Sequence, residues 1–236
     1  EWNGYNTAWY TPSETAALGA AGSKIYIPTG VTTGGTADPN RVKRVQIKFW
    51  AGLAPEGYQE VPMEIPWGWK LFWQDTVHYD NRLAIAALAL SSAIEGSGNN
   101  VISLLKTLGF QKTAYYEYDT LVTRDVTHAI AGRRVQMDGE DWDIFAVVSR
   151  GTGNGSDILT DLLPGGFYDA AENTWENVQS YLMDYYGVSS MEEVKGRNMK
   201  FFVTGHSLGG AVANVLSPKI GALVPSQNVF VYTFAS

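Results

Sequence analysis

The chain contains no cysteine among its 236 residues. This absence excludes disulfides and thiolate-bound metals, and it fits a cytosolic protein and a bacterial extracellular protein equally. Basic residues are also few, since 17 Lys and Arg stand against 24 Asp and Glu, a formal net charge of −7. This balance argues against nucleic acids and anionic membrane surfaces as electrostatic partners and leaves uncharged partners open.

Long apolar runs are absent too. The nearest candidate, Leu83–Ile94, is interrupted by Ser91 and Ser92 and falls short of the roughly 20 apolar residues of a membrane-spanning helix. Apolar residues nevertheless make up 45% of the chain. That share predicts a globular protein with a full core, of a length that one α/β domain can use.

The most informative segment is Gly205–Gly209 (GHSLG), which has the pattern Gly-x-Ser-x-Gly. An apolar run at 199–204 precedes it and a helix-compatible run at 211–216 follows it. In this strand–turn–helix context a serine nucleophile is presented at the end of a sheet, in a strained backbone conformation. The flanking glycines avoid collisions with the strand and the helix. A surface loop that happens to be rich in glycine is the alternative, and the flanking pattern favours the catalytic interpretation.

A second segment supports the first. The apolar run Asp143–Val148 predicts a buried strand, and it leads directly into Ser149–Leu162 (SRGTGNGSDILTDL). Several motifs together resemble the class 3 lipase family of α/β-hydrolases: RGT at 150–152, D-x-x-x-D-L at 157–162, GFYDAA at 166–171, TGHSLGGA at 204–211 and NVFVYTFAS at 228–236. The resemblance extends from about residue 145 to the end of the chain and, less specifically, back to about residue 80.

The resemblance implies a fold and a division of the chain. It implies an α/β-hydrolase, that is, a mostly parallel sheet with helices on both faces and a β-rich N-terminal elaboration. We expect residues 1–75 to form this elaboration, packed on the core, and residues 76–236 to form the hydrolase core. The core would be truncated after the strand at 228–234, with the C-terminal part of the fold missing from this chain.

The resemblance also assigns roles to residues. Ser207 would be the nucleophile, and the backbone N–H groups of Leu208 and Thr152 would form the oxyanion hole. Gly205, His206 and Gly209 would be structural residues of the turn. Thr152 could instead be an ordinary turn threonine, but its RGT context favours the catalytic role. No metal and no cofactor is expected.

A catalytic base is the missing part. After Ser207 the sequence contains no Asp, Glu or His, and serine without a base is a poor nucleophile. His206 would point away from the serine, and His78 and His128 are expected to be structural. We therefore expect the Asp and His partners to come from a C-terminal fragment of the same protein, either a separate chain after cleavage or a segment that has been lost.

The expected function is carboxylic-ester hydrolysis through an acyl-enzyme on Ser207, with lipid acylglycerols or small esters as substrates and a lipid interface as a further partner. A catalytically inactive binding protein on the same fold is one alternative, and an acyltransferase or peptidase is another. The family and the polar start of the chain, rich in Trp, Tyr and Gly, favour secretion, from a bacterium. A short connection after Asp161 predicts a small lid over 153–162 and hydrolysis of soluble short-chain esters without an interface.

Local patterns predict further elements. We expect strands at 24–27 and 42–49, a hairpin that turns at Asp138-Gly139, and helices at 83–94, 101–108 and 169–186. The second helix should begin at Asn99 or Asn100 and end at Gly109, and the third should end at Gly187. Six tryptophans lie in the first 75 residues, where we expect packing rather than a binding surface: Trp2, Trp9, Trp50, Trp67, Trp69 and Trp73.

Overall fold

A computed structural model describes residues 67–73, 79–118, 125–151 and 166–234, together with the backbone of three short strands nearer the N-terminus. These strands form an antiparallel sheet in the order β2-β1-β3, from β1 (Lys24–Pro28), β2 (Lys48–Trp50) and β3 (Tyr58–Glu60). The strand expected at 24–27 is therefore confirmed. The run expected at 42–49 is described only from Lys48 onward, and the domain division at residue 75 stays a prediction.

The main sheet has five strands in the order β4-β5-β6-β7-β8. Its strands are β4 (Lys112–Tyr116), β5 (His128–Met137), β6 (Glu140–Ser149), β7 (Met199–His206) and β8 (Val229–Phe234). Strands β4, β5 and β6 pair antiparallel, whereas β6, β7 and β8 pair parallel. The parallel half contains the segments that carry the family motifs, and each of its crossovers includes a helix, as parallel pairing requires.

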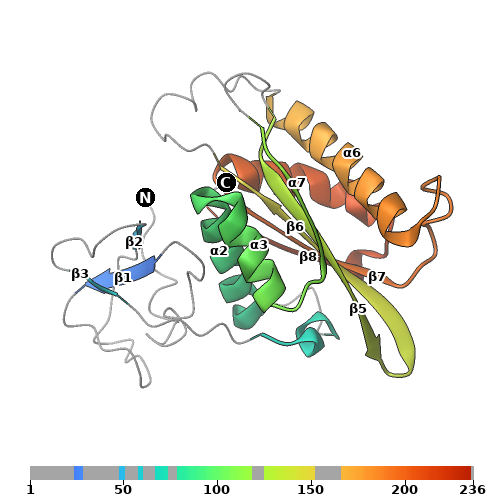
Figure 1. Cartoon of the computed structure of the whole chain (residues 1–236), viewed down its shortest axis with the longest axis horizontal. Coiled ribbons are helices and arrows are strands. Elements are labelled where there is room, and N and C mark those ends of the chain that lie inside the picture. The colour runs from blue at the N-terminus through green and yellow to red at the C-terminus, as the bar shows by residue number, and fades with distance from the viewer. Residues whose placement is uncertain are drawn as a thin grey trace.

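Helices cover both faces of this sheet (Figure 1). On one face lie α2 (Asn81–Gly96) and α3 (Gly98–Thr107), and on the other lie α6 (Gly166–Tyr186) and α7 (Leu208–Gly221). Consecutive residues of β7 show the alternation, since Phe202 packs in the cluster with α2 and α3 while Phe201 packs in the cluster with α6 and α7. The expectation of an α/β sheet with helices on both faces is confirmed.

The tryptophans near residue 70 belong to the core. The short 3₁₀ helix η2 (Trp69–Trp73) buries Leu71 and Phe72, and Trp67 donates its indole N–H to the carbonyl of Leu108 at 2.7 Å. Trp67, Trp69 and Trp73 pack against the cluster beneath α2 and α3, so the packing interpretation is confirmed for these three. The side chains of Trp2, Trp9 and Trp50 lie outside the described residues.

Most of the expected turns and helix ends are confirmed. The hairpin turns at Asp138 and Gly139, which both have positive φ, of 52° and 83°, and this matches the right-handed twist of the strands. Gly109 and Gly187, with φ of 91° and 66°, follow the ends of α3 and α6. The expected start of α3 was wrong, because the Ser97 hydroxyl accepts the N–H of Asn100 and caps the helix two or three residues earlier.

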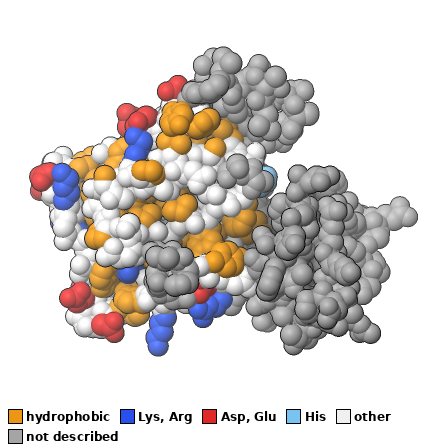
Figure 2. Space-filling view, turned by 180° about the vertical axis from the view of Figure 1, so that it is seen from behind, with side chains coloured by type: hydrophobic (Ala, Val, Ile, Leu, Met, Phe, Trp, Pro, Cys, Tyr) orange, Lys and Arg blue, Asp and Glu red, His pale blue; other side chains and the backbone are white. Residues whose placement is uncertain are grey.

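The surface of the described residues mixes charges of both signs. On the face shown in Figure 2, acidic and basic side chains stand singly or in small groups between apolar patches, without a continuous basic area. None of the described helices combines the length and the apolar character that crossing a membrane would require.

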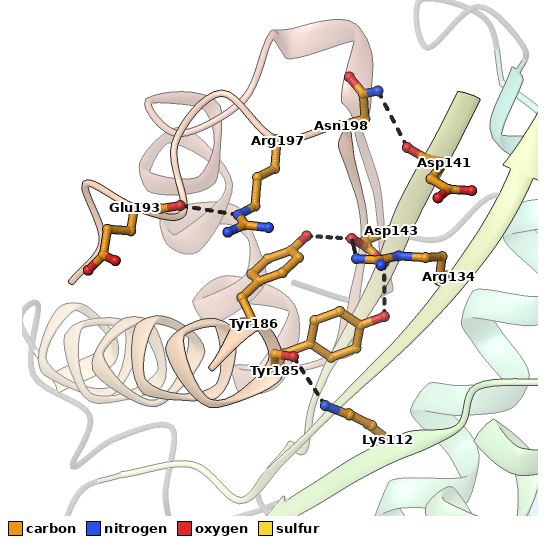
Figure 3. A network of polar contacts seen from close by, with 9 residues as sticks. All are labelled: Lys112, Arg134, Asp141, Asp143, Tyr185, Tyr186, Glu193, Arg197 and Asn198. Atoms are coloured by element: carbon orange, nitrogen blue, oxygen red, sulfur yellow. Dashed lines mark hydrogen bonds and ion pairs between the residues drawn. The ribbon is translucent and has the colours of Figure 1, made fainter. Parts of the chain in front are cut away.

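A buried carboxylate joins the sheet to α6 at the amino end of the parallel strands (Figure 3). Asp143 of β6 accepts two hydrogen bonds from the Arg134 guanidinium, at 3.0 and 2.9 Å. The hydroxyls of Tyr185 and Tyr186 donate to the same carboxylate at 2.9 and 2.8 Å. Burial and the neighbouring carboxylate raise the pKa of both tyrosines, so they stay protonated and act as donors.

Asp143→Asn should destabilise the fold, because it replaces one of two accepting oxygens with an NH₂ group that faces existing donors. We expect a loss of about 2–3 kcal/mol in the free energy of unfolding, measured by urea denaturation. Asp141→Asn on the same strand is the matched control, since Asp141 is exposed, and should change stability by less than about 0.5 kcal/mol. Equal stability of the two variants would show that the network contributes nothing.

Candidate active site

The parallel register brings two of the motifs to the same edge of the sheet. Ser149 at the end of β6 lies opposite Gly205, and His206 at the end of β7 lies opposite Phe234. The chain leaves β6 through Gly151 and leaves β7 through Ser207. Both segments therefore emerge at the carboxyl edge of adjacent parallel strands, where open α/β sheets place their ligands.

Ser207 has a backbone conformation that is rare for a residue with a side chain, with φ 53° and ψ −125°. A conformation of this kind costs about 1–3 kcal/mol, so the surrounding structure must hold it. The Ser207 N–H donates to the carbonyl of Phe234 at 2.9 Å, and the Ser207 carbonyl accepts the N–H of Ala211 at 3.1 Å. Ser207 is the residue before α7, yet its hydroxyl makes no hydrogen bond that caps the helix.

Two glycines allow the turn to pack against the strand ends. A Cβ on Gly205 would collide with the backbone of Gly209 and Gly210, and a Cβ on Gly209 would collide with the carbonyls of Ser149 and Arg150. These neighbours are backbone atoms and cannot rotate away. The start of α7 therefore lies directly against the ends of β6 and β7, and Ser207 is held between them.

Of the two expected oxyanion donors, the structure describes one. Leu208 is buried and is the first residue of α7, so its N–H has no acceptor within the helix. Thr152 lies outside the described residues, as does the expected lid segment at 153–162 with Asp157 and Asp161. The residue before Thr152, Gly151, is described and packs against the turn, since a Cβ built on it would lie 3.3 Å from the Ser207 Cβ.

An apolar cluster flanks the serine. Leu208 and Val212 of α7 pack with Ala170 and Ala171 of α6 and with Val126. Phe167 and Val215 are partly buried against this cluster, and Tyr168 beside Phe167 is one of the large exposed apolar side chains. Leu208, the residue after Ser207, is thus part of an apolar cluster.

His128 is buried and structural, as expected. Its Nδ1–H donates to the carbonyl of Val126 at 2.8 Å, and its Nε2 accepts from the Asn177 amide at 3.3 Å. The ring stacks with the rings of Tyr116 and Tyr118. Both ring nitrogens are occupied in the neutral form, and burial lowers the pKa of His128 from its ordinary value of 6.5 to about 4.

Of the other two histidines, the structure describes one. His206 is exposed and its Nδ1 lies 3.8 Å from a carboxylate oxygen of Glu95, while His78 lies outside the described residues. Glu95 itself was not expected at this edge. It is next to last in α2, and no sequence signal places it here, because its position depends on how α2 packs across the sheet. Among the described residues there is no group of three His, Asp or Glu side chains arranged to hold a metal ion.

The burial of His128 predicts that stability falls with acidification. Because the unfolded chain binds a proton near pH 6.5 and the folded one only near pH 4, the folded state loses stability as the pH falls through this window. We expect this histidine to account for about 2–3 kcal/mol between pH 7 and pH 4.5. Urea denaturation at both pH values measures the change.

His128→Phe should weaken this pH dependence, whatever its own stability at pH 7. His206→Asn is the matched control and should keep the parent's dependence, because His206 is exposed. An unchanged pH dependence in His128→Phe would contradict the assignment.

The close backbone contact at Gly209 predicts that this position cannot accommodate even a methyl group. Gly209→Ala should destabilise the protein by about 3 kcal/mol or more, because backbone must move to admit the Cβ. Gly221→Ala in the same helix is the matched control, since nothing lies within 4 Å of its Cβ, and it should be neutral or more stable by up to about 1 kcal/mol. Thermal unfolding of the two variants compares them, and equal melting temperatures would contradict the packing.

Comparisons with known proteins agree with the motifs. The family described as lipase (class 3) matches residues 146–236. A curated lipase of Caenorhabditis elegans, Lipase ZK262.3, is 35% identical over 107 residues, which cover 38% of this chain and 28% of that protein. The match to a fungal lipase solved in complex with an inhibitor covers 51% of this chain and 47% of that one, at 22% identity and a TM-score of 0.33.

The matched region contains the turn and the three strand ends that surround it. The aligned part spans only 28% of the nematode lipase, so the activity of the whole protein does not follow from this match alone. The topology of β6, β7, α7 and β8, with a serine in a strained turn between β7 and α7, is that of an α/β-hydrolase. Residues 146–236 of this chain are similar to the class 3 lipase family.

Proposed function

We propose that the protein is a serine carboxylic-ester hydrolase that acts on acylglycerols through an acyl-enzyme on Ser207. The observation that carries the proposal is the backbone of Ser207, whose positive φ of 53° places a serine in a strained turn at the carboxyl edge of a parallel sheet. A serine in a surface loop would have no reason to adopt this conformation. The family match supports the reaction class.

The surroundings of Ser207 support transfer of an acyl group. The start of α7 brings the positive end of a helix dipole to the serine, and this favours the negative charge of a tetrahedral intermediate. In the proposed reaction the Ser207 hydroxyl attacks the ester carbonyl, the alcohol leaves with a proton, and water then releases the acid. The N–H groups of Leu208 and Thr152 would hold the oxyanion.

The base of this reaction would come from outside the described residues. His128 is unsuitable because its two ring nitrogens are already paired. In the family order the acid and the histidine follow the serine, and residues 208–236 contain neither an acidic residue nor a histidine. A hydrolase-fold binding protein without activity is the alternative, and it predicts that no ester is hydrolysed by the complete protein.

Apolar side chains beside the serine support a substrate with a hydrocarbon part. Leu208, Val212 and Phe167 belong to one apolar cluster next to the turn. Such a surface favours the acyl chain of an ester over a charged substrate, because it offers no compensation for lost hydration. The negative formal charge of the chain also suits an uncharged lipid.

Ser207→Ala tests the proposal in the complete protein. We expect kcat/KM for p-nitrophenyl butyrate and for tributyrin to fall by about 10³-fold or more, because the acyl-enzyme cannot form. A fluorophosphonate should label the parent at the peptide that contains Ser207 and should not label the variant.

Ser217→Ala is the matched control on the same helix. The Ser217 hydroxyl donates to the carbonyl of Ala213, and its loss should leave the rate within about twofold of the parent. Hydrolysis by Ser207→Ala within about tenfold of the parent would contradict the proposal. A parent that neither hydrolyses either ester nor reacts with the probe would support the inactive binding protein instead.

A further inference from the structure

Glu95 occupies an electrostatically unfavourable position at the end of α2. A negative charge in the last turn of a helix opposes the helix dipole. The last turn of α2 contains no basic residue that would offset it. The carboxylate is instead directed toward the edge of the sheet, where its side chain remains only 28% exposed.

The Glu95 side chain connects three segments at this edge. Its Oε1 accepts the backbone N–H of Gly151 at 2.7 Å, a short bond to a charged acceptor. The Nε of Arg150 lies 3.7 Å from its other oxygen, and the Nη2 of Arg150 donates to the Glu95 carbonyl at 3.3 Å. His206 of the serine turn lies 3.8 Å from Oε1. The C-terminal end of α2 thus contacts the residues that follow β6 and the last residue of β7.

Gly151 is enclosed between this carboxylate and the serine turn. A Cβ on Gly151 would lie 2.8 Å from the Glu95 Oε1, 2.8 Å from the His206 carbonyl oxygen and 3.3 Å from the Ser207 Cβ. The backbone of Gly151 therefore fills the space between the Glu95 carboxylate and the serine turn. The hydrogen bond from the Gly151 N–H to Glu95 determines how the peptide between Arg150 and Gly151 is oriented. The next residue along the chain is Thr152, whose N–H is the second oxyanion donor of the proposed function.

We propose that Glu95 is a positioning residue for the oxyanion hole: its carboxylate orients the Arg150–Gly151 segment against the Ser207 turn. This inference rests on the proposed function. Glu95 touches no reacting atom in this role and acts through the backbone of Gly151. Because donors must sit within a few tenths of an ångström of the developing oxyanion, loss of this hydrogen bond should slow the acyl transfer step more than it weakens substrate binding.

An ordinary ion pair at the surface would give different results. Exposed pairs contribute little to stability, and removal of one would not change kcat. The length and the charge of the side chain can be separated by three substitutions. Gln has the length of Glu and keeps one accepting oxygen, but it has no charge. Asp keeps the charge but is one methylene shorter, and Ala has neither an accepting oxygen nor a charge.

The experiment measures kcat and KM for p-nitrophenyl butyrate with the complete protein and the variants Glu95→Gln, Glu95→Asp and Glu95→Ala. We expect the Asp and Ala variants to lose about 10–100-fold in kcat with KM within about threefold, and the Gln variant to stay within about threefold in kcat. Glu192→Ala, which removes a surface ion pair with Lys195 on the loop before β7, is the matched control and should match the parent. Thermal unfolding of each variant shows whether it is folded at the assay temperature.

The outcomes separate the two proposals. If the parent is active and its Ser207 is labelled, but Glu95→Ala and Glu95→Asp keep the parent's kcat, the positioning role is wrong and the proposed function stands. A variant set in which Asp retains kcat and Gln loses it would show that charge and not the hydrogen bond matters, and would also overturn the inference.

If Glu95→Ala does not fold, the comparison of Glu95→Asp with Glu95→Gln decides alone. An inactive parent with an unlabelled Ser207 would remove the proposed function, and this inference with it.

Discussion

The architecture around the serine depends on one constraint, the direct contact of backbone with backbone where α7 begins. Gly209 lies against the carbonyls at the end of β6, and Gly205 lies against Gly209 itself. Interiors pack densely, so a contact of this kind leaves no room for adjustment. It determines the angle at which α7 leaves the sheet, and with it the conformation of Ser207 between the two glycines.

The two ends of the parallel strands are built in different ways. At the amino end, Asp143 accepts hydrogen bonds from Arg134, Tyr185 and Tyr186, so that a buried carboxylate is fully paired. At the carboxyl end, Ser207 holds a strained conformation and its hydroxyl caps no helix N–H. A satisfied network stabilises the strands from which the strained turn projects, and strain at a functional site is tolerated only when the rest of the fold holds it.

The ionisable residues near the serine turn are held by specific contacts. Glu95 contacts Arg150, Gly151 and His206, so the helix on one face of the sheet is connected to the segments that leave its edge. His128, at the same edge, is kept neutral by burial, which lowers its pKa, and both of its ring nitrogens are hydrogen-bonded. Proximity to the edge therefore does not by itself make a residue available for proton transfer; the bonds that it already makes decide this.

Much of the fold could be predicted from local signals. The Asp138-Gly139 turn, the stop signals at Gly109 and Gly187 and the strand–turn–helix pattern around Ser207 each depend on neighbours within a few residues. The start of α3 was misjudged by only a few residues, because Ser97 and the two asparagines after it are all good capping residues. Strand β4 was not predicted, since its five residues become a strand through pairing with β5.

The sequence by itself determined the family motifs, the serine turn and the lack of Asp, Glu and His in residues 208–236. Only the tertiary structure decided that Glu95 reaches Gly151, 56 positions further along the chain, and that His128 is paired on both nitrogens. The physical reason is the separation in sequence over which each kind of interaction acts. Turns and caps are set by steric and hydrogen-bonding preferences of adjacent residues, whereas contacts between a helix end and a strand end depend on how the sheet and helices pack.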